Sequence, residues 1–153
     1  MDEKRSEEIE QKQYIVVKLG SEQYGIDIQY VDNIVRMQRV TRVPKAQPYF
    51  KGVINIRGEV IPVMSLRIKF GLEPDEFKNA TRILIIKIEP QAAIGMIVDE
   101  VKEVITLGEE SIDKVSGGND EKSLYLSGVG KQPNGLVSLL NIPAVVMERE
   151  SAM

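Results

Sequence analysis

The sequence carries two adjoining apolar runs, Gly52-Val-Ile-Asn-Ile-Arg57 and Glu59-Val-Ile-Pro-Val-Met64. Both are rich in β-branched residues, which favour strands. Gly58 alone separates them, and a glycine between two such runs is typical of a tight turn. The stretch therefore predicts a β-hairpin. Pro62 has no backbone N–H to donate, so we expect it at a sheet edge or at a bulge.

Runs of the same kind continue on both sides of this hairpin. The clearest is Thr81-Arg-Ile-Leu-Ile-Ile-Lys-Ile88, and Asn134-Gly135 marks a second hairpin turn. Further strands are expected at residues 14–19, 24–28, 93–98, 101–107, 124–130 and 136–140. About eight to ten short strands with little helix predict an all-β fold, either a barrel or a sandwich.

Only short helical segments are expected between these strands. The apolar spacing over residues 31–35 predicts a helical turn. Ser65 is a suitable N-cap for a short helix over residues 66–70, and residues 142–150 are expected to form a closing helix. The longest predicted loop covers residues 108–122.

The second half of the chain repeats the apolar pattern of the first. The segment that begins at Gly25 has the same spacing as the one that begins at Gly95, 70 residues later, and residues 60–66 match residues 136–142 at an offset of 76. Similar offsets in the same order indicate two copies of one unit of roughly 70 residues. The alternative is that any two amphipathic strands resemble each other.

A duplication of this kind predicts how the chain is divided. A unit of about 70 residues is too small for a robust core of its own, so the two halves are expected to share a hydrophobic seam. The predicted division is a flexible arm over residues 1–12, one β-barrel over residues 13–80 and a second β-barrel over residues 81–150. Together the two barrels make one domain over residues 13–150.

Composition argues against several classes of function. The 153-residue chain has no Cys, His or Trp, and its net charge is −3. It therefore lacks a thiolate nucleophile, the usual general base and the ligands of a structural zinc site, so we expect no enzyme, cofactor or metal. The acidic balance disfavours nucleic acid, and no apolar run approaches the roughly 20 residues that cross a membrane. The polar N-terminus lacks the apolar core of a signal peptide, which predicts a cytoplasmic location.

Two glycine-rich motifs and two acidic pairs are better explained as ordinary loops, strands and surface residues than as ligand-binding or catalytic sites. Gly128-Val-Gly-Lys131 lacks the spacing and the hydroxyl group of a phosphate-binding loop, and residues 117–120 lack the oxygen spacing of a calcium loop. Asp99-Glu100 and Glu109-Glu110 are sequence neighbours, whose side chains point to opposite faces of a strand. We expect both pairs on a solvated surface.

Cationic residues mark two candidate binding surfaces. A basic stretch without intervening acids either docks an acidic protein surface or keeps a loop soluble; it comprises Arg36, Arg39, Arg42 and Lys45. In the central hairpin, Asn55 and Arg57 fall on the same face of the predicted strand, among apolar residues. Arg57 must then find partners for its five donors. It forms either a buried structural ion pair or part of a recognition site.

Taken together, these motifs resemble the CheW-like family of bacterial chemotaxis coupling proteins, which includes the matching regulatory domain of the chemotaxis histidine kinase. The resemblance covers most of the chain from Gln13 to Glu148. The segments that carry it are Leu19-Gly-Ser-Glu-Gln-Tyr-Gly-Ile-Asp-Ile28 with Val31 and Ile34, Gly52-Val-Ile-Asn-Ile-Arg-Gly58, Ile61-Pro-Val-Met-Ser-Leu-Arg-Ile-Lys-Phe-Gly71, and Gly95-Met-Ile-Val-Asp99 with Val101 and Val104. Each segment alone is unspecific, and the specificity comes from their combination.

The resemblance implies two five-stranded SH3-like β-barrels packed on a shared hydrophobic interface. It also implies an adaptor without catalysis, which binds the regulatory domain of the histidine kinase CheA and, in a groove between the barrels, the cytoplasmic tip of a chemoreceptor (a methyl-accepting chemotaxis protein). Such a protein is expected to be a monomer in isolation, without direct membrane insertion, and to be recruited to receptor arrays at the inner face of the cell membrane. A ligand-binding or regulatory double barrel that uses the same groove is the alternative.

Positions that match the family's motifs supply the candidate partner-binding residues. The match implies that they contact or support the receptor or the kinase, and they are Val31, Ile34, Gly52, Asn55, Arg57, Gly58 and Gly95. One position departs from the pattern, because Asn33 stands where relatives often have Glu. If that Glu normally pairs with the arginine, Arg57 must bond differently here, or use Asp32 or Asp27.

Overall fold

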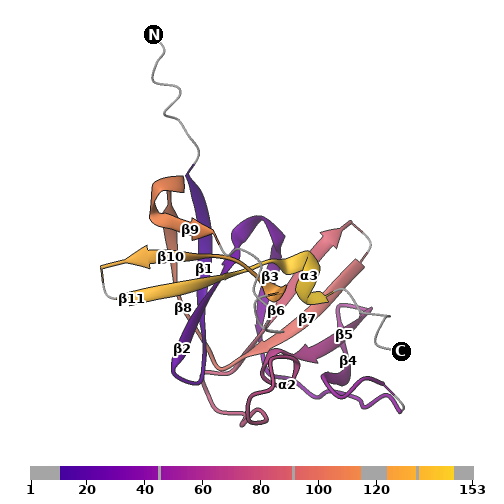
Figure 1. The fold of residues 1–153 in the computed structure, drawn as a ribbon. Coiled ribbons are helices and arrows are strands. Elements are labelled where there is room, and N and C mark those ends of the chain that lie inside the picture. Colours follow the sequence, from indigo (N-terminus) through magenta and orange to yellow (C-terminus); the bar gives the residue numbers. More distant parts are fainter. Residues whose placement is uncertain (1–10, 45, 91, 115–123, 134, 147–153) are drawn as a thin grey trace.

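The computed structural model describes residues 11–44, 46–90, 92–114, 124–133 and 135–146, and these residues form two twisted β-sheets (Figure 1). The predicted all-β class is confirmed. The helical pieces are short: the α-helices α2 (Leu66–Lys69) and α3 (Ile142–Val146), and the 3-10 turns η1 (Ile28–Tyr30) and η2 (Glu109–Ser111). Among the described residues, no helix is long and apolar enough to cross a membrane.

The strands divide into a six-stranded sheet, named sheet A, and a five-stranded sheet, named sheet B. In spatial order, sheet A contains β8 (Glu100–Leu107), β1 (Lys12–Leu19), β2 (Glu22–Asp27), β11 (Gly135–Leu140), β10 (Leu126–Gln132) and β9 (Ile112–Lys114). Sheet B contains β3 (Val31–Arg36), β6 (Arg82–Glu89), β7 (Ala92–Val98), β5 (Glu59–Ser65) and β4 (Phe50–Ile56). Sheet A thus has one short strand, β9, beyond the five that were expected.

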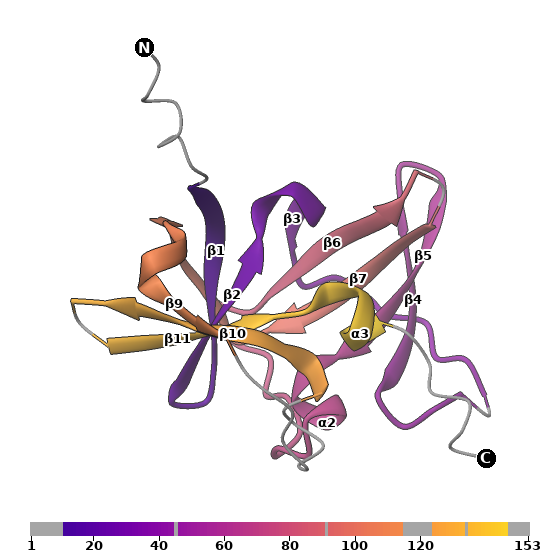
Figure 2. The ribbon, with the colours of Figure 1, turned by 45° about the horizontal axis from the view of Figure 1, so that its top comes forward.

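The path of the chain differs from the predicted division into residues 13–80 and 81–150. Sheet B is built from one continuous segment, residues 31–98, whereas sheet A takes its strands from residues 12–27 and 100–140 (Figure 2). The predicted boundary therefore does not separate the two sheets. The reason is long-range pairing, because β1 pairs with β8 and β2 pairs in parallel with β11. Lys12, expected in the arm, is the first residue of β1.

Within this path the predicted internal repeat is visible as a shared topology. Strands β8-β1-β2-β11-β10 of sheet A follow the same order as β3-β6-β7-β5-β4 of sheet B, with a hairpin and a parallel pair at matching places. The parallel pair places Leu139 beside Gly25 in sheet A and Val63 beside Gly95 in sheet B. These are the positions that the two sequence offsets relate to each other.

The buried side chains form three groups, one of which joins the two sheets. A core of sheet A gathers around Val16, and a core of sheet B gathers around Ile83. The third group, named the shared core, takes residues from both sheets and includes Ile15, Leu84 and Met96. Strands β1 and β6 bury both faces, since successive residues alternate between the core of their own sheet and the shared core. The predicted hydrophobic seam between two small lobes is confirmed.

Most local predictions are confirmed, and three are wrong. The predicted loop over residues 108–122 contains η2 and β9 in its described part. The β4–β5 and β10–β11 hairpins form, and the Ser65 hydroxyl caps α2 by accepting the N–H of Ile68 at 3.1 Å. Residues 31–35 are a strand rather than a helical turn, because their β-branched residues pair with β6. Pro62 lies in an interior strand and not at an edge, but the pairing of β5 with β7 begins only at Val63. The predicted end of the closing helix lies outside the described residues.

Candidate functional site

Two of the predicted site residues lie on β3, an edge strand of sheet B, and form the first apolar strip. Ile34 stands opposite Leu84, a member of the shared core, so its side chain emerges at the border of that core with 38% exposure. Val31 packs against the same core. We name Val31 and Ile34 the β3 strip. Because the β3 strip borders the shared core, an apolar partner that packs on the strip would extend that core.

An equivalent strip lies on β8, the matching edge strand of sheet A. Val104 stands opposite Ile15 of the shared core and is 50% exposed, and Val101 packs against that core. Val101 and Val104 are named the β8 strip. They were not among the predicted site residues, although both lie 70 positions after members of the β3 strip. Carrying the repeat over to the site would have identified them.

The tip of the β4–β5 hairpin holds three of the predicted residues. The Asn55 side-chain oxygen accepts the N–H of Gly58 at 3.0 Å and so closes the turn. Arg57 has a φ of 53° and lies in the turn itself, so the prediction that it shares a strand face with Asn55 is wrong. Its side chain is exposed, and within the described chain it makes no ion pair, which excludes the buried structural pair among those residues.

Of the two carboxylates proposed as alternative partners of Arg57, Asp32 is exposed and Asp27 is engaged elsewhere, and Asn33 bonds locally. Asn33 accepts the N–H of Ile34 through its side-chain oxygen at 2.9 Å. Asp27 accepts the N–H of Gln29 at 3.0 Å and lies 3.7 Å from the Lys12 ammonium group. The replacement of the family's usual Glu by Asn33 therefore leaves no unpaired buried charge at Arg57.

Two predicted glycines are buried and act through the backbone. A Cβ atom on Gly52 would stand 2.0 Å from the carbonyl oxygen of Thr41, and the φ of Gly52 is 141°. This close approach allows the Thr41–Val53 bridge, which connects the segment after β3 to β4 and draws the two edges of sheet B together. Gly95 lies inside sheet B, where a Cβ atom would stand 2.8 Å from Ile83 Cγ2. Both glycines support the surface without forming it.

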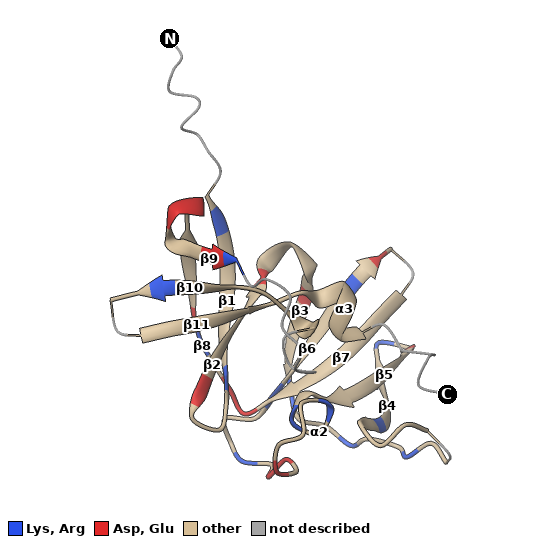
Figure 3. Cartoon of the chain, in the orientation of Figure 1, with Lys and Arg blue, Asp and Glu red and all other residues tan. Residues whose placement is uncertain are grey.

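A basic surface surrounds the Thr41–Val53 bridge. Lys and Arg gather on and beside β4 (Figure 3), and the exposed cations include Arg36, Arg39 and Arg42 of the predicted basic stretch. Lys45 lies outside the described residues. An open pocket of about 420 Å³ between Arg39, Asn55 and Val60 adds apolar area, because Val60 is 62% exposed. Cations around an exposed apolar side chain suit an acidic protein surface.

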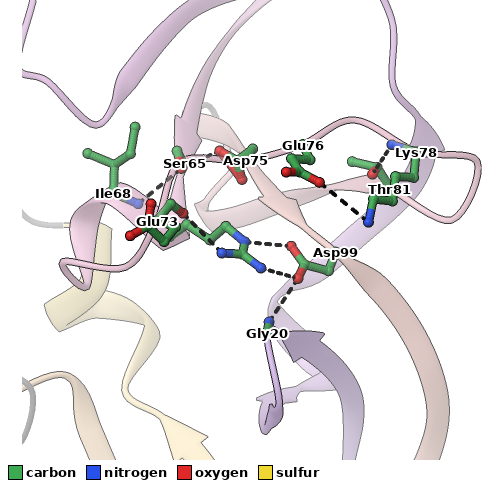
Figure 4. A network of polar contacts seen from close by, with 10 residues as sticks. Gly20, Ser65, Ile68, Glu73, Asp75, Glu76, Lys78, Thr81 and Asp99 are labelled. Atoms are coloured by element: carbon green, nitrogen blue, oxygen red, sulfur yellow. Dashed lines mark hydrogen bonds and ion pairs between the residues drawn. The ribbon is translucent and has the colours of Figure 1, made fainter.

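A network of polar contacts joins the two sheets at the β7–β8 connection (Figure 4). The Asp99 carboxylate accepts two hydrogen bonds from the Arg67 guanidinium, at 2.8 and 2.7 Å, and a third from the N–H of Gly20 at 2.8 Å. These bonds hold the pKa of Asp99 below its ordinary value. The prediction that Asp99 belongs to a solvated acidic pair is wrong, because its partner lies 32 residues away in sequence.

A second carboxylate of the same region is held differently. Asp75 accepts the hydroxyl of buried Ser65 at 2.6 Å, while its other oxygen is buried without a hydrogen-bond partner. Burial raises the pKa of Asp75, opposed by the Ser65 hydrogen bond and by the charges of Lys51 and Arg67. Among the described residues no three acidic side chains come together in a way that holds a metal ion.

Comparison with known proteins identifies the family of the chain. The sequence model of the CheW-like domain matches residues 13–150. The chain belongs to the CheW family. Within that family it is similar to the chemotaxis protein CheW of Bacillus subtilis, with 36% identity over 90% of this chain and 88% of the relative, and to that of Helicobacter pylori, with 34% identity over 94% and 86%.

A solved structure of the CheW family has the same fold. The crystal structure of the scaffolding protein TtCheW from Thermoanaerobacter tengcongensis superposes with a TM-score of 0.79 at 31% identity, covering 86% of this chain and 90% of that one. Proteins of the CheW family are chemotaxis scaffolds or adaptors and not enzymes. Family membership therefore confirms the predicted adaptor class and the prediction that the chain is not an enzyme.

Proposed function

We propose that this adaptor couples chemoreceptors to the histidine kinase CheA by binding both. The observation that carries the proposal is the pair of apolar strips, on β3 and on β8, that border the core shared by the two sheets. An amphipathic helix buries its apolar face on such a surface, so the strips suit the helical hairpin at a chemoreceptor's cytoplasmic tip. The protein would then act in the cytoplasm, recruited to receptor arrays at the inner face of the membrane.

The basic surface around the Thr41–Val53 bridge supports a second contact, with the regulatory domain of CheA. That surface lies on sheet B, combines Arg39 and Arg42 with exposed Val60, and is separate in sequence from the β8 strip. Two distinct surfaces allow one monomer to hold two partners at once. Control of the kinase follows from a difference in contacts between its signalling states, without any covalent step in the adaptor.

Binding measurements with purified partners test this function. The full chain is titrated against a chemoreceptor cytoplasmic fragment, against the CheA regulatory domain, and against a mixture of the two. We expect binding to each partner and a ternary complex in the mixture, because the basic surface and the two strips are made of different residues. Failure to bind either partner would overturn the proposal, and competition between the partners would show that they share one surface.

A further inference from the structure

The chain passes between the two sheets at only two places in the part of the chain that the structure describes. The first crossover, from Asp27 to Val31, leads from β2 to β3, and the second, from Val98 to Glu100, leads from β7 to β8. Each crossover leads directly into a strand that carries one of the two apolar strips. The separation of the two strips therefore depends on how firmly each crossover is tied to both sheets.

The second crossover is tied by one residue, Asp99. Its backbone N–H donates to the carbonyl oxygen of Lys18 in β1 at 3.0 Å, and its carboxylate accepts the N–H of Gly20 in the β1–β2 turn, so it is bonded twice to sheet A. The same carboxylate takes both bonds from Arg67, which lies on α2 directly after β5 of sheet B. Arg67 is fixed in turn, because it donates to the carbonyl oxygen of Glu73 at 3.0 Å.

The Arg67–Asp99 pair differs in kind from the other ion pairs of the described residues. The two side chains are 17% and 27% exposed and meet at 2.7 Å through two parallel bonds. By contrast, Lys78–Glu76 and Lys131–Asp113 meet at 3.5 Å with exposures above one half. A two-bond arginine–carboxylate contact fixes orientation as well as distance, whereas a lysine contact fixes neither closely.

The first crossover has no comparable ion pair or side-chain hydrogen bond to the other sheet within the residues that the structure describes. Its Asp27 caps η1 locally, by accepting the N–H of Gln29 two residues later, and its ion pair with Lys12 lies within sheet A. The repeat that relates the two sheets is thus broken at this point. Among the ion pairs between described residues, only the one at the crossover into β8 runs from one sheet to the other, and Val101 of the β8 strip follows Asp99 by two residues.

We infer that Arg67 and Asp99 are positioning residues, which hold the β8 strip at a fixed separation from the β3 strip so that one partner engages both. This inference rests on the proposed function for the identity of the partner, but the geometry it predicts is measurable without one. Losing the pair would leave each sheet folded, because the cores of sheets A and B contain neither residue. It would broaden the distribution of separations between the strips.

The absence of cysteine in the chain makes that separation accessible to spin labels. Asp32 and Lys102 are exposed and occupy equivalent places, each skipped where the register of its strand pairing shifts, on β3 and on β8 respectively. The double variant Asp32→Cys/Lys102→Cys carries two nitroxide labels, whose distance distribution is measured by pulsed electron paramagnetic resonance. Circular dichroism of each variant confirms that the sheets are intact.

Four further substitutions are then compared in this labelled background. Asp99→Asn and Arg67→Met remove the ion pair, Arg67→Lys keeps the charge without the two-bond geometry, and Lys131→Met removes an exposed pair as the control. We expect one narrow distance peak in the parent and in Lys131→Met, a broad distribution in Asp99→Asn and Arg67→Met, and an intermediate one in Arg67→Lys. An unchanged narrow peak in Asp99→Asn and Arg67→Met, with intact sheets, would overturn the inference.

Binding of the receptor fragment by the unlabelled variants separates this inference from the proposed function. If about one molecule in ten keeps the competent separation, the apparent dissociation constant rises about tenfold. Broadened distances together with weakened binding support both statements. Broadened distances with unchanged binding, or with no binding even by the parent chain, support the positioning role and reject the strips as the receptor surface. Weakened binding with unchanged distances rejects the positioning role.

Discussion

Gly25 and Gly95 occupy equivalent positions in the two sheets, and at each of them the neighbouring side chain fills the space that a Cβ atom would need. The built Cβ atom stands 2.8 Å from Leu139 Cδ2 at Gly25 and 2.8 Å from Ile83 Cγ2 at Gly95. Each glycine lies beside the parallel strand pair of its sheet. The repeat thus preserves a packing constraint as well as an apolar pattern.

We predict that Gly25→Ala and Gly95→Ala each lower the free energy of unfolding by about 1–3 kcal/mol, because the added methyl group overpacks a buried site. Gly108→Ala is the matched control: the three atoms nearest to its Cβ would belong to the flexible carboxylate of Glu110, which is exposed. Urea denaturation measures all three. Equal stability of Gly95→Ala and Gly108→Ala would show that the core around Ile83 relaxes freely.

The β4–β5 turn gives a second prediction. Arg57→Ala is expected to change the free energy of unfolding by no more than about 0.5 kcal/mol, since its side chain is exposed and unpaired within the described chain. Asn55→Ala removes the hydrogen bond to Gly58 and is expected to cost about 0.5–1.5 kcal/mol. Denaturant titrations measure the free energy of unfolding of both variants. A loss of several kcal/mol for Arg57→Ala would show that Arg57 belongs to a buried ion pair.

Asp75 makes stability depend on pH in a defined direction. Burial raises the pKa of Asp75, so the folded state favours the protonated carboxyl group. The stabilisation from protonation is complete below the unfolded pKa and is lost as the pH rises through the folded pKa. Asp75→Asn removes this dependence and leaves the nearby charges of Lys51 and Arg67 in place.

We therefore expect the stability of Asp75→Asn, relative to the parent chain, to increase as the pH rises from 4 to 7. Urea denaturation at several pH values measures the difference between the two proteins. Ser65→Ala serves as a control for the shared hydrogen bond, since it removes the donor while the carboxyl group still titrates. A difference between Asp75→Asn and the parent that does not vary with pH would contradict the assignment.

The apolar strips give a prediction about binding. Ile34→Ser and Val104→Ser are each expected to raise the dissociation constant for a receptor fragment about tenfold or more, because buried apolar contacts dominate such interfaces. Val43→Ser is the matched control, as Val43 is 46% exposed but lies outside both strips. Isothermal titration calorimetry measures the three variants. An effect of Ile34→Ser alone would confine the receptor to sheet B.

Much of the fold was predictable because its signals are local. The β6 run is apolar at successive positions, and Gly58 marks the turn of the β4–β5 hairpin, so strands and turns follow from short stretches of sequence. The sheet that each strand joins was not predictable in this way. Consecutive strands usually stay together, which favoured a boundary at residue 80, but β1 pairs with β8 across more than 80 residues of sequence.

The predictions about the candidate site show the same difference between local and long-range features. Ile34 was identified from a motif and lies on an exposed strip, whereas Arg57 was placed on a strand because strand periodicity gives no warning of its left-handed turn conformation. Asp99 was assigned to a solvated pair because its partner, Arg67, lies on α2, 32 residues earlier in the sequence. Contacts of that kind depend on the path of the chain in space and leave no local pattern.

The order in which the strands are synthesised has a consequence for folding. Residues 31–98 hold every strand of sheet B, so that lobe has all its partners while the ribosome is still adding β8. Strands β1 and β2, made first, wait for β8 and β11 before their outer hydrogen-bonding groups are paired. During that interval they are open strand edges, which other nascent chains can pair with. The earliest strands of this protein are thus the last to be fully paired, and a chain that stops before Ser138 leaves β2 without its β11 partner and open to aggregation.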